Sequence, residues 1–234
     1  MFDAGQPPFD DSRIRQALAL AIDREQLTDV IFKGFHAPAT GGLLPPGMPG
    51  HSPGIGLPYD PERSRQLLAE AGYPNGRGFP KLDALLLNTF APLGEYLHAQ
   101  WQKNLGIEVP WKTVDWEEYI HINTIAGLQA NMVIFGIYPA YPDPESLLGI
   151  EITQNSTNWR HAGYERLVKQ ARRLQDQEVR MQLYQQAEHI LIAEAAIVPL
   201  CYHWYPMLVK PWIEKFTISA VLDWFWKDVI IEPH

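Results

Sequence analysis

Residues 82–114 read LDALLLNTFAPLGEYLHAQWQKNLGIEVPWKTV, and the fold class follows from this segment. The apolar run at Leu82–Leu87 predicts a buried strand, and Ile107–Val114 predicts a second one. Between them lie apolar residues at the spacing of one helical face: Leu93, Tyr96, Leu97, Trp101 and Leu105. Strand, helix and strand in this order predict two parallel neighbouring strands joined by a right-handed crossover at 92–105.

The segments on either side continue the alternation of helices and strands. Three aspartates precede helical patterns and are predicted to cap them: Asp11, Asp23 with Gln26 three residues on, and Asp60 with Pro61 beside it. The proline- and glycine-rich segment 36–59 shows neither the apolar spacing of a helix nor that of a strand. Such long loops are usually functional or packed on a neighbouring part of the protein. Downstream we expect a helix around Trp116–Ile125, a strand at Met132–Tyr138, an irregular stretch at 149–160, two amphipathic helices within 164–191 and a strand-like end at 197–234. The predicted class is α/β, a mostly parallel sheet flanked by helices, with some antiparallel strands at the end.

Composition excludes several classes of function. The chain has 234 residues, of which 46% are hydrophobic, and a formal net charge of −8. An acidic surface argues against nucleic acid as a partner. The single cysteine, Cys201, excludes an internal disulfide and a cysteine-based zinc site, and the eight histidines show no metal-ligand spacing. No catalytic motif stands in a believable context, so we expect a binding module without catalytic residues, metal or cofactor.

Several short segments, in order along nearly the whole chain, resemble one protein family. They are FDDSRIRQALALAIDR (9–24), PAT (38–40) with LPPG (44–47), YDPE (59–62) with LLAEAGY (67–73), YPDP (141–144) and KDV (227–229). Together they are similar to the family-5 extracellular solute-binding proteins, the receptors of peptide and related ATP-binding-cassette (ABC) importers. The resemblance implies a type II periplasmic-binding fold, in which a solute binds in a cleft between two lobes.

The resemblance also implies an organisation for the chain. Residues 1–203 correspond to the carboxy-terminal lobe, and residues 204–234 to a return segment that would normally complete the first lobe. The expected partners are a peptide or other small solute, the first lobe and a membrane permease. The full-length protein is expected in the periplasm or outside the cell, although Met1–Pro8 has no signal-peptide features. The alternative is a ligand-sensing domain at the end of a larger cytoplasmic transcriptional regulator.

Candidate ligand-binding residues follow from the expected sheet. Ligands of open parallel sheets bind beyond the carboxyl ends of the strands, which here are Asn88, Asp115–Trp116, and Tyr138 to Tyr141, and we take Asn88, Trp116, Tyr138 and Tyr141 as the candidates. Core packing is the alternative for Trp116. The polar stretch 155–159 adds Asn158 and Trp159, with an ordinary surface loop as the alternative.

Two further residues bear on what the ligand is. Asp143 is followed by a proline, which predicts a helix cap rather than a ligand contact. In peptide-binding members of the family, an aspartate just before the matching tyrosine pairs with the peptide ammonium, and Ala140 stands at that position here. A buried ammonium without a carboxylate is costly, which argues against recognition of a peptide amino terminus. The apolar end at 204–234 also predicts self-association of the isolated chain.

Overall fold

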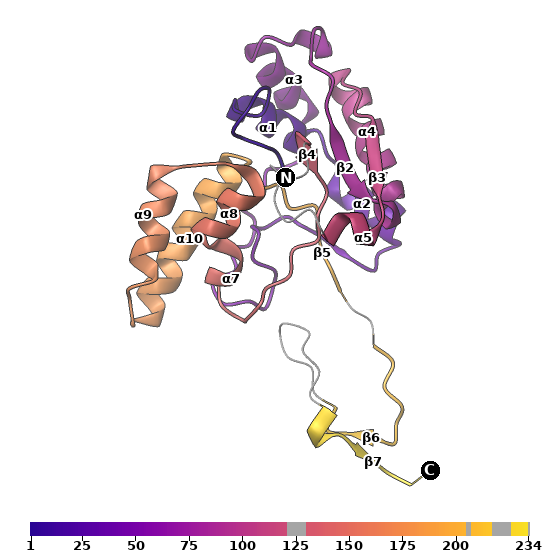
Figure 1. Ribbon diagram of the computed structural model, residues 1–234, viewed down its shortest axis with the longest axis vertical. Coiled ribbons are helices and arrows are strands. Elements are labelled where there is room, and N and C mark those ends of the chain that lie inside the picture. Colours follow the sequence, from indigo (N-terminus) through magenta and orange to yellow (C-terminus); the bar gives the residue numbers. More distant parts are fainter. Residues whose placement is uncertain (121–129, 205–206, 217–225, 234) are drawn as a thin grey trace.

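The computed structural model describes residues 1–120, 130–204, 207–216 and 226–233 (Figure 1). At its centre is a three-stranded parallel sheet with the order β3-β2-β4. The strands are β2 (Ala84–Leu87), β3 (Trp111–Val114) and β4 (Met132–Val133). Ala84 is in register with Trp111 on one side and with Met132 on the other. The predicted parallel pair, with α4 (Ala91–Leu105) between its strands, is confirmed.

The strands are shorter than the sequence predicted. β3 begins only after Pro110, because proline has no N–H to donate to a neighbouring strand. β4 was predicted to extend to Tyr138 but ends at Val133, with one more backbone bond from Ile134 to Leu85 at 3.0 Å. On its other side β4 is bridged by the chain start, where Phe2 pairs with Met132 and Met1 exchanges backbone hydrogen bonds with Val133. β2 continues to Leu87, two residues past its pairing with Val133, so β4 leaves the sheet before its neighbour ends.

Helices surround the sheet and begin at the predicted aspartates. The carboxylates of Asp11, Asp23 and Asp60 accept backbone N–H bonds from Arg13, Gln26 and Arg63. These caps open α1 (Ser12–Leu20), α2 (Arg24–Phe32) and α3 (Pro61–Glu70). Short 3-10 turns follow at η1 (Pro74–Gly76) and η2 (Asn88–Phe90). After β3 comes α5 (Trp116–Ile120); the rest of the predicted helix, 121–125, lies outside the described residues.

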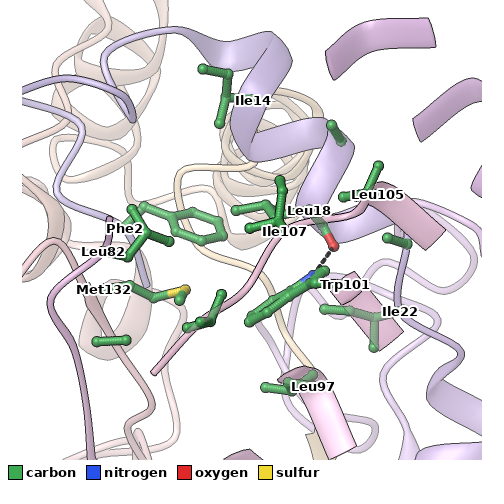
Figure 2. Packing of buried hydrophobic residues seen from close by; sticks show 14 of the residues in the cluster. Phe2, Ile14, Leu18, Ile22, Leu82, Leu97, Trp101, Leu105, Ile107 and Met132 are labelled. Atoms are coloured by element: carbon green, nitrogen blue, oxygen red, sulfur yellow. Dashed lines mark hydrogen bonds between the residues drawn. The ribbon is translucent and has the colours of Figure 1, made fainter. Parts of the chain in front are cut away.

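The core lies between α1, α4 and one face of the sheet (Figure 2). Trp101 of α4 is buried there, and its indole N–H donates to the carbonyl of Leu18 in α1 at 2.9 Å. Leu86 of β2 points into this core, whereas Leu85 and Leu87 belong to a smaller apolar cluster on the other face. β2 is therefore buried on both sides, as expected for the central strand of a parallel sheet.

A separate helical layer packs beside this α/β unit (Figure 1). It comprises α7 (Glu145–Leu148), α8 (Ile150–Thr157), α9 (Ala162–Ala171) and α10 (Gln177–Ala193). The prediction of an irregular stretch at 149–160 is wrong, because α8 occupies most of it. Ile150, Thr153 and Thr157 form its buried face, and both threonine hydroxyls bond to carbonyls of their own helix. Polar residues on that face concealed the helical period.

The carboxy-terminal part is antiparallel. β1 (Ala37–Pro38) pairs with β5 (Cys201–Tyr202), and β6 (Ile213–Glu214) pairs with β7 (Ile230–Ile231) after the short turn η3 (Trp226–Asp228). The β6–β7 pair stands away from the rest of the molecule (Figure 1). Among the described residues, no helix combines the length and apolar character that crossing a membrane requires.

Candidate functional site

Four of the six predicted ligand-binding residues follow the carboxyl ends of the parallel strands. Asn88 comes directly after β2, and Trp116 is separated from β3 by one residue. Tyr138 and Tyr141 lie on the connection that leaves β4 for the helical layer. All four are exposed, and the three aromatic side chains retain 64%, 56% and 47% of their accessible surface, in chain order. Core packing of Trp116 is thereby excluded.

An aromatic row, formed by Trp116, Tyr119 and Phe135, runs along this edge. The Trp116 and Tyr119 ring centroids are 5.8 Å apart with planes inclined by 27°, and those of Tyr119 and Phe135 are 5.3 Å apart at 25°. These are stacked arrangements of the kind that stabilise aromatic pairs. Tyr119 is buried on the apolar cluster of β2, β3 and β4, so it fixes two exposed rings against the sheet. The sequence analysis missed Tyr119 and Phe135, although both lie within three residues of a predicted strand end or site residue.

The hydroxyl group of Tyr119 lies in an apolar environment. Its hydroxyl oxygen is buried and has no hydrogen-bond partner among the described residues. Burial raises the pKa of Tyr119, and the nearby Tyr138 raises it further, so the phenol stays neutral. A buried hydroxyl without a partner is costly. A polar ligand atom that reached it would remove that cost.

Carboxylates near this edge are engaged to different degrees. Asp115 is exposed and accepts the backbone N–H of Glu118 at 2.8 Å, which starts α5. Asp143 accepts the backbone N–H of Glu145, the first residue of α7, at 2.9 Å, although the N-cap of that helix is Pro144, one residue after the predicted cap. Its carboxylate also forms an ion pair with Arg180 of α10, at 2.6 and 2.7 Å. The local sequence does not predict this ion pair, because its two residues are 37 positions apart.

The last two predicted residues lie elsewhere. Trp159 keeps only 5% of its surface and packs edge-on against Tyr164 in the helical layer, with centroids 5.1 Å apart. Asn158 ends α8 in a left-handed conformation, and its amide donates to Asp3 at 2.8 Å. Trp159 therefore has no exposed ring face to offer a ligand. The prediction that Trp159, in the polar stretch 155–159, binds the ligand is therefore wrong.

Two other observations delimit the site. In the part of the chain that the structure describes, no group of three or more histidine, cysteine, aspartate or glutamate side chains is arranged to hold a metal ion. A shallow hollow of about 600 Å³ lies over α9 rather than at the strand ends, and it is lined by Ala162, Glu165, Arg166, Lys169, Gln170, Arg173 and Leu174.

Comparisons with known proteins agree with this architecture. Residues 1–159 match the model of the bacterial extracellular solute-binding proteins, family 5, middle part. A di/tripeptide-binding protein of Pseudomonas aeruginosa is 30% identical, over 93% of this chain and 42% of that protein. A probable deoxycholate-binding periplasmic protein of Escherichia coli is 29% identical, over 100% of this chain and 45% of that protein.

Solved structures show the same fold. A periplasmic oligopeptide-binding protein of Borrelia burgdorferi superimposes with a TM-score of 0.78 and 28% identity, over 86% of this chain and 41% of that one. The murein tripeptide-binding protein of Escherichia coli gives a TM-score of 0.83 at 24% identity, over 100% of this chain and 47% of that one. The chain thus spans less than half the length of each relative named here.

Proposed function

Because this chain belongs to the family-5 bacterial extracellular solute-binding proteins, we propose that it forms one lobe of a receptor that delivers a solute to an ABC importer. Residues 1–203 would be the carboxy-terminal lobe, and residues 204–234 would return to complete the first lobe. The exposed β6–β7 pair, separate from the described body of the chain, supports that division (Figure 1). The full-length receptor would act in the periplasm and present its closed form to a membrane permease.

The aromatic row carries the proposal for the binding surface. Trp116 and Phe135 present exposed rings fixed by Tyr119, at the edge where open parallel sheets bind ligands. Tyr138 and Tyr141 would extend this apolar wall, and Asn88 would supply hydrogen bonds. A ligand with rings or apolar groups suits such a wall. The names of the relatives span di- and tripeptides and, for one, deoxycholate.

We propose binding without turnover. No described side chain at this edge forms a nucleophile–base pair, and the family and the relatives named above are binding proteins. The regulator alternative is not favoured, because those relatives are binding proteins rather than transcription factors.

The first test identifies the ligand and then the surface. Mass spectrometry of small molecules that co-purify with the full-length protein would name a solute, and calorimetry would measure its affinity. We expect Trp116→Ala and Tyr141→Ala each to weaken binding about five- to thirtyfold, since aromatic anchors typically contribute about 1–2 kcal/mol or more.

The matched control is Tyr59→Ala. Tyr59 is 42% exposed, close to the 47% of Tyr141. Its hydroxyl lies 3.4 Å from Asn104 near the end of α4, at the opposite edge of the sheet. Unchanged affinity in this control is expected. Equal losses in all three variants, or none in the two edge variants, would contradict the proposed surface.

A further inference from the structure

The pair between Asp143 and Arg180 occupies both oxygens of one carboxylate. Arg180 Nη1 donates to Oδ2 at 2.6 Å and Nη2 donates to Oδ1 at 2.7 Å. This two-point geometry is the strongest form of arginine–carboxylate pairing. The Glu145 backbone N–H also donates to Oδ1, so three bonds converge on this group.

The surroundings hold the arginine in place. The Arg180 and Asp143 side chains are 14% and 29% exposed, so solvent weakens the pair less than it would on an open surface. The guanidinium lies 5.0 Å from the centre of the Tyr184 ring, and the Tyr184 hydroxyl donates to Glu145. Arg172, which follows the last residue of α9, forms an ion pair with the same glutamate. The hydrogen bonds from Arg180 also hold the pKa of Asp143 below its usual range, so the pair stays ionised near neutral pH.

The carboxylate lies close to the proposed ligand surface. Asp143 is two residues from Tyr141, and its N–H donates to the Tyr141 carbonyl at 2.8 Å. The Ser146 hydroxyl donates to the same carbonyl at 3.0 Å. Between Gly136 and Pro144, Asp143 is the sole acidic residue of the sequence. Any negative charge offered to a ligand by this connection must therefore come from Asp143.

We infer that Arg180 is a specificity-determining residue. By engaging both oxygens of Asp143, it leaves the connection at Tyr141 without a free negative charge, so the ligand group that this connection binds carries no positive charge. An ammonium group would have to compete with a charge-assisted, two-point pair. This inference rests on the proposed function, because it concerns the ligand of that same surface.

The test compares two peptides on three proteins by calorimetry. The probes are Ala-Phe-Ala with a free amino terminus and the same peptide acetylated there. The proteins are the full-length wild type, Arg180→Met, and Arg180→Met combined with Asp143→Asn. Both variants lose the ion pair, but only the single variant leaves a free carboxylate. Circular dichroism checks folding, and Arg180→Gln replaces Arg180→Met if the latter does not fold.

We expect the wild type to bind both peptides about equally and Arg180→Met to prefer the free amine by about three- to tenfold. The double variant should lose that preference, which a purely structural role of Arg180 does not predict. Equal preferences in all three proteins, or a wild-type preference that depends on Asp143, would contradict the role of Arg180 alone. If no protein binds either peptide, peptide recognition by this surface is contradicted as well.

Discussion

Glu188 is a carboxyl group with no exposed surface, in the middle of α10. One oxygen accepts the backbone N–H of Leu44 at 2.7 Å, and the other has no hydrogen-bond partner in the described residues. Burial raises the pKa of Glu188, and the Leu44 bond with the neighbouring Ser52 and His51 only partly offsets this. The residue therefore ties the long proline- and glycine-rich loop to α10. The segment 36–59 is therefore packed on a neighbouring helix, which is one of the two roles predicted from its length.

Glu188 should make folding sensitive to pH. Because its pKa is higher in the folded than in the unfolded chain, its contribution to stability is complete at low pH. That contribution falls as the pH rises above the unfolded value of about 4.3. We expect Glu188→Gln, which keeps the shape of the neutral acid, to melt at a higher temperature than wild type at pH 8. The difference should shrink toward pH 4.5.

Thermal melts at several pH values test this prediction. A change of 1 kcal/mol moves the melting temperature by about 2–4 °C in chains of 150–250 residues, so the effect is measurable. Glu95→Gln is the control, because Glu95 is an exposed carboxylate on α4. Its difference from wild type should stay nearly constant with pH. A Glu188→Gln variant that is less stable at pH 8 than at pH 4.5, relative to wild type, would contradict the assignment.

Contacts within a few residues were predictable, and contacts between distant residues were not. Asp11, Asp23 and Asp60 cap the expected helices because a cap is satisfied by the next turn of backbone. The partner of Asp143 is on another helix, and the burial of Trp159 depends on how α8 and α9 pack. Such facts depend on the assembled fold.

At the scale of elements, α4 packs against the sheet through a glycine. A methyl group added at Gly94 would overlap Leu86 Cδ2 and lie 3.1 Å from Trp111 Cδ1. Leu86 is fully buried, so it has little room to yield. The glycine is thus what allows the helix to approach β2 and β3 closely.

Gly94→Ala should therefore destabilise the protein although alanine favours helix. The gain in helix propensity is about 1 kcal/mol, whereas overpacking a core typically costs about 1–3 kcal/mol. We expect a net loss of roughly 1 kcal/mol, measured by urea unfolding. Ala99→Gly at an exposed position of the same helix should show the ordinary propensity cost alone. A stabilised Gly94→Ala would mean that α4 can move away from the sheet at little cost.

Helices and strands whose apolar residues follow one regular spacing were predictable from the sequence. Those whose buried face also carries polar residues were not. α4 and β2 carry continuous apolar positions, so their order and parallel pairing followed from the sequence alone. α8 buries two threonines that bond within their own helix, which hides its period. The end of β4 was missed because the apolar residues after Val133 continue the strand pattern, although the chain leaves the sheet there while β2 still runs on to Leu87.

At the scale of the whole molecule, the carboxy-terminal end leaves apolar surface uncovered. Trp204, Leu208 and Ile231 are exposed by 64%, 104% and 68%, on the segment that stands away from the body of the chain (Figure 1). This segment could in principle fold back onto its own lobe. In the described residues it does not. Monomers rarely tolerate apolar patches of several hundred Å², and each large aromatic ring can bury about 150–250 Å².

We therefore expect the isolated 234-residue chain to self-associate through residues after His203. Exchange of an identical segment between two copies is a low-cost route to a dimer, and an unpaired strand edge favours it. Light scattering over a concentration series should give a mass that rises with concentration. A chain ending at His203, which keeps β5 and its pairing with β1, should stay monomeric. The intact chain carrying Leu208→Ser and Ile231→Ser keeps the length of the segment but loses apolar surface. It should also associate less than the unmodified chain, which distinguishes the effect of apolar surface from that of length. Association of the shortened chain would place the interface on the lobe itself. A strict monomer of the intact chain would mean that the segment finds cover on its own lobe in solution.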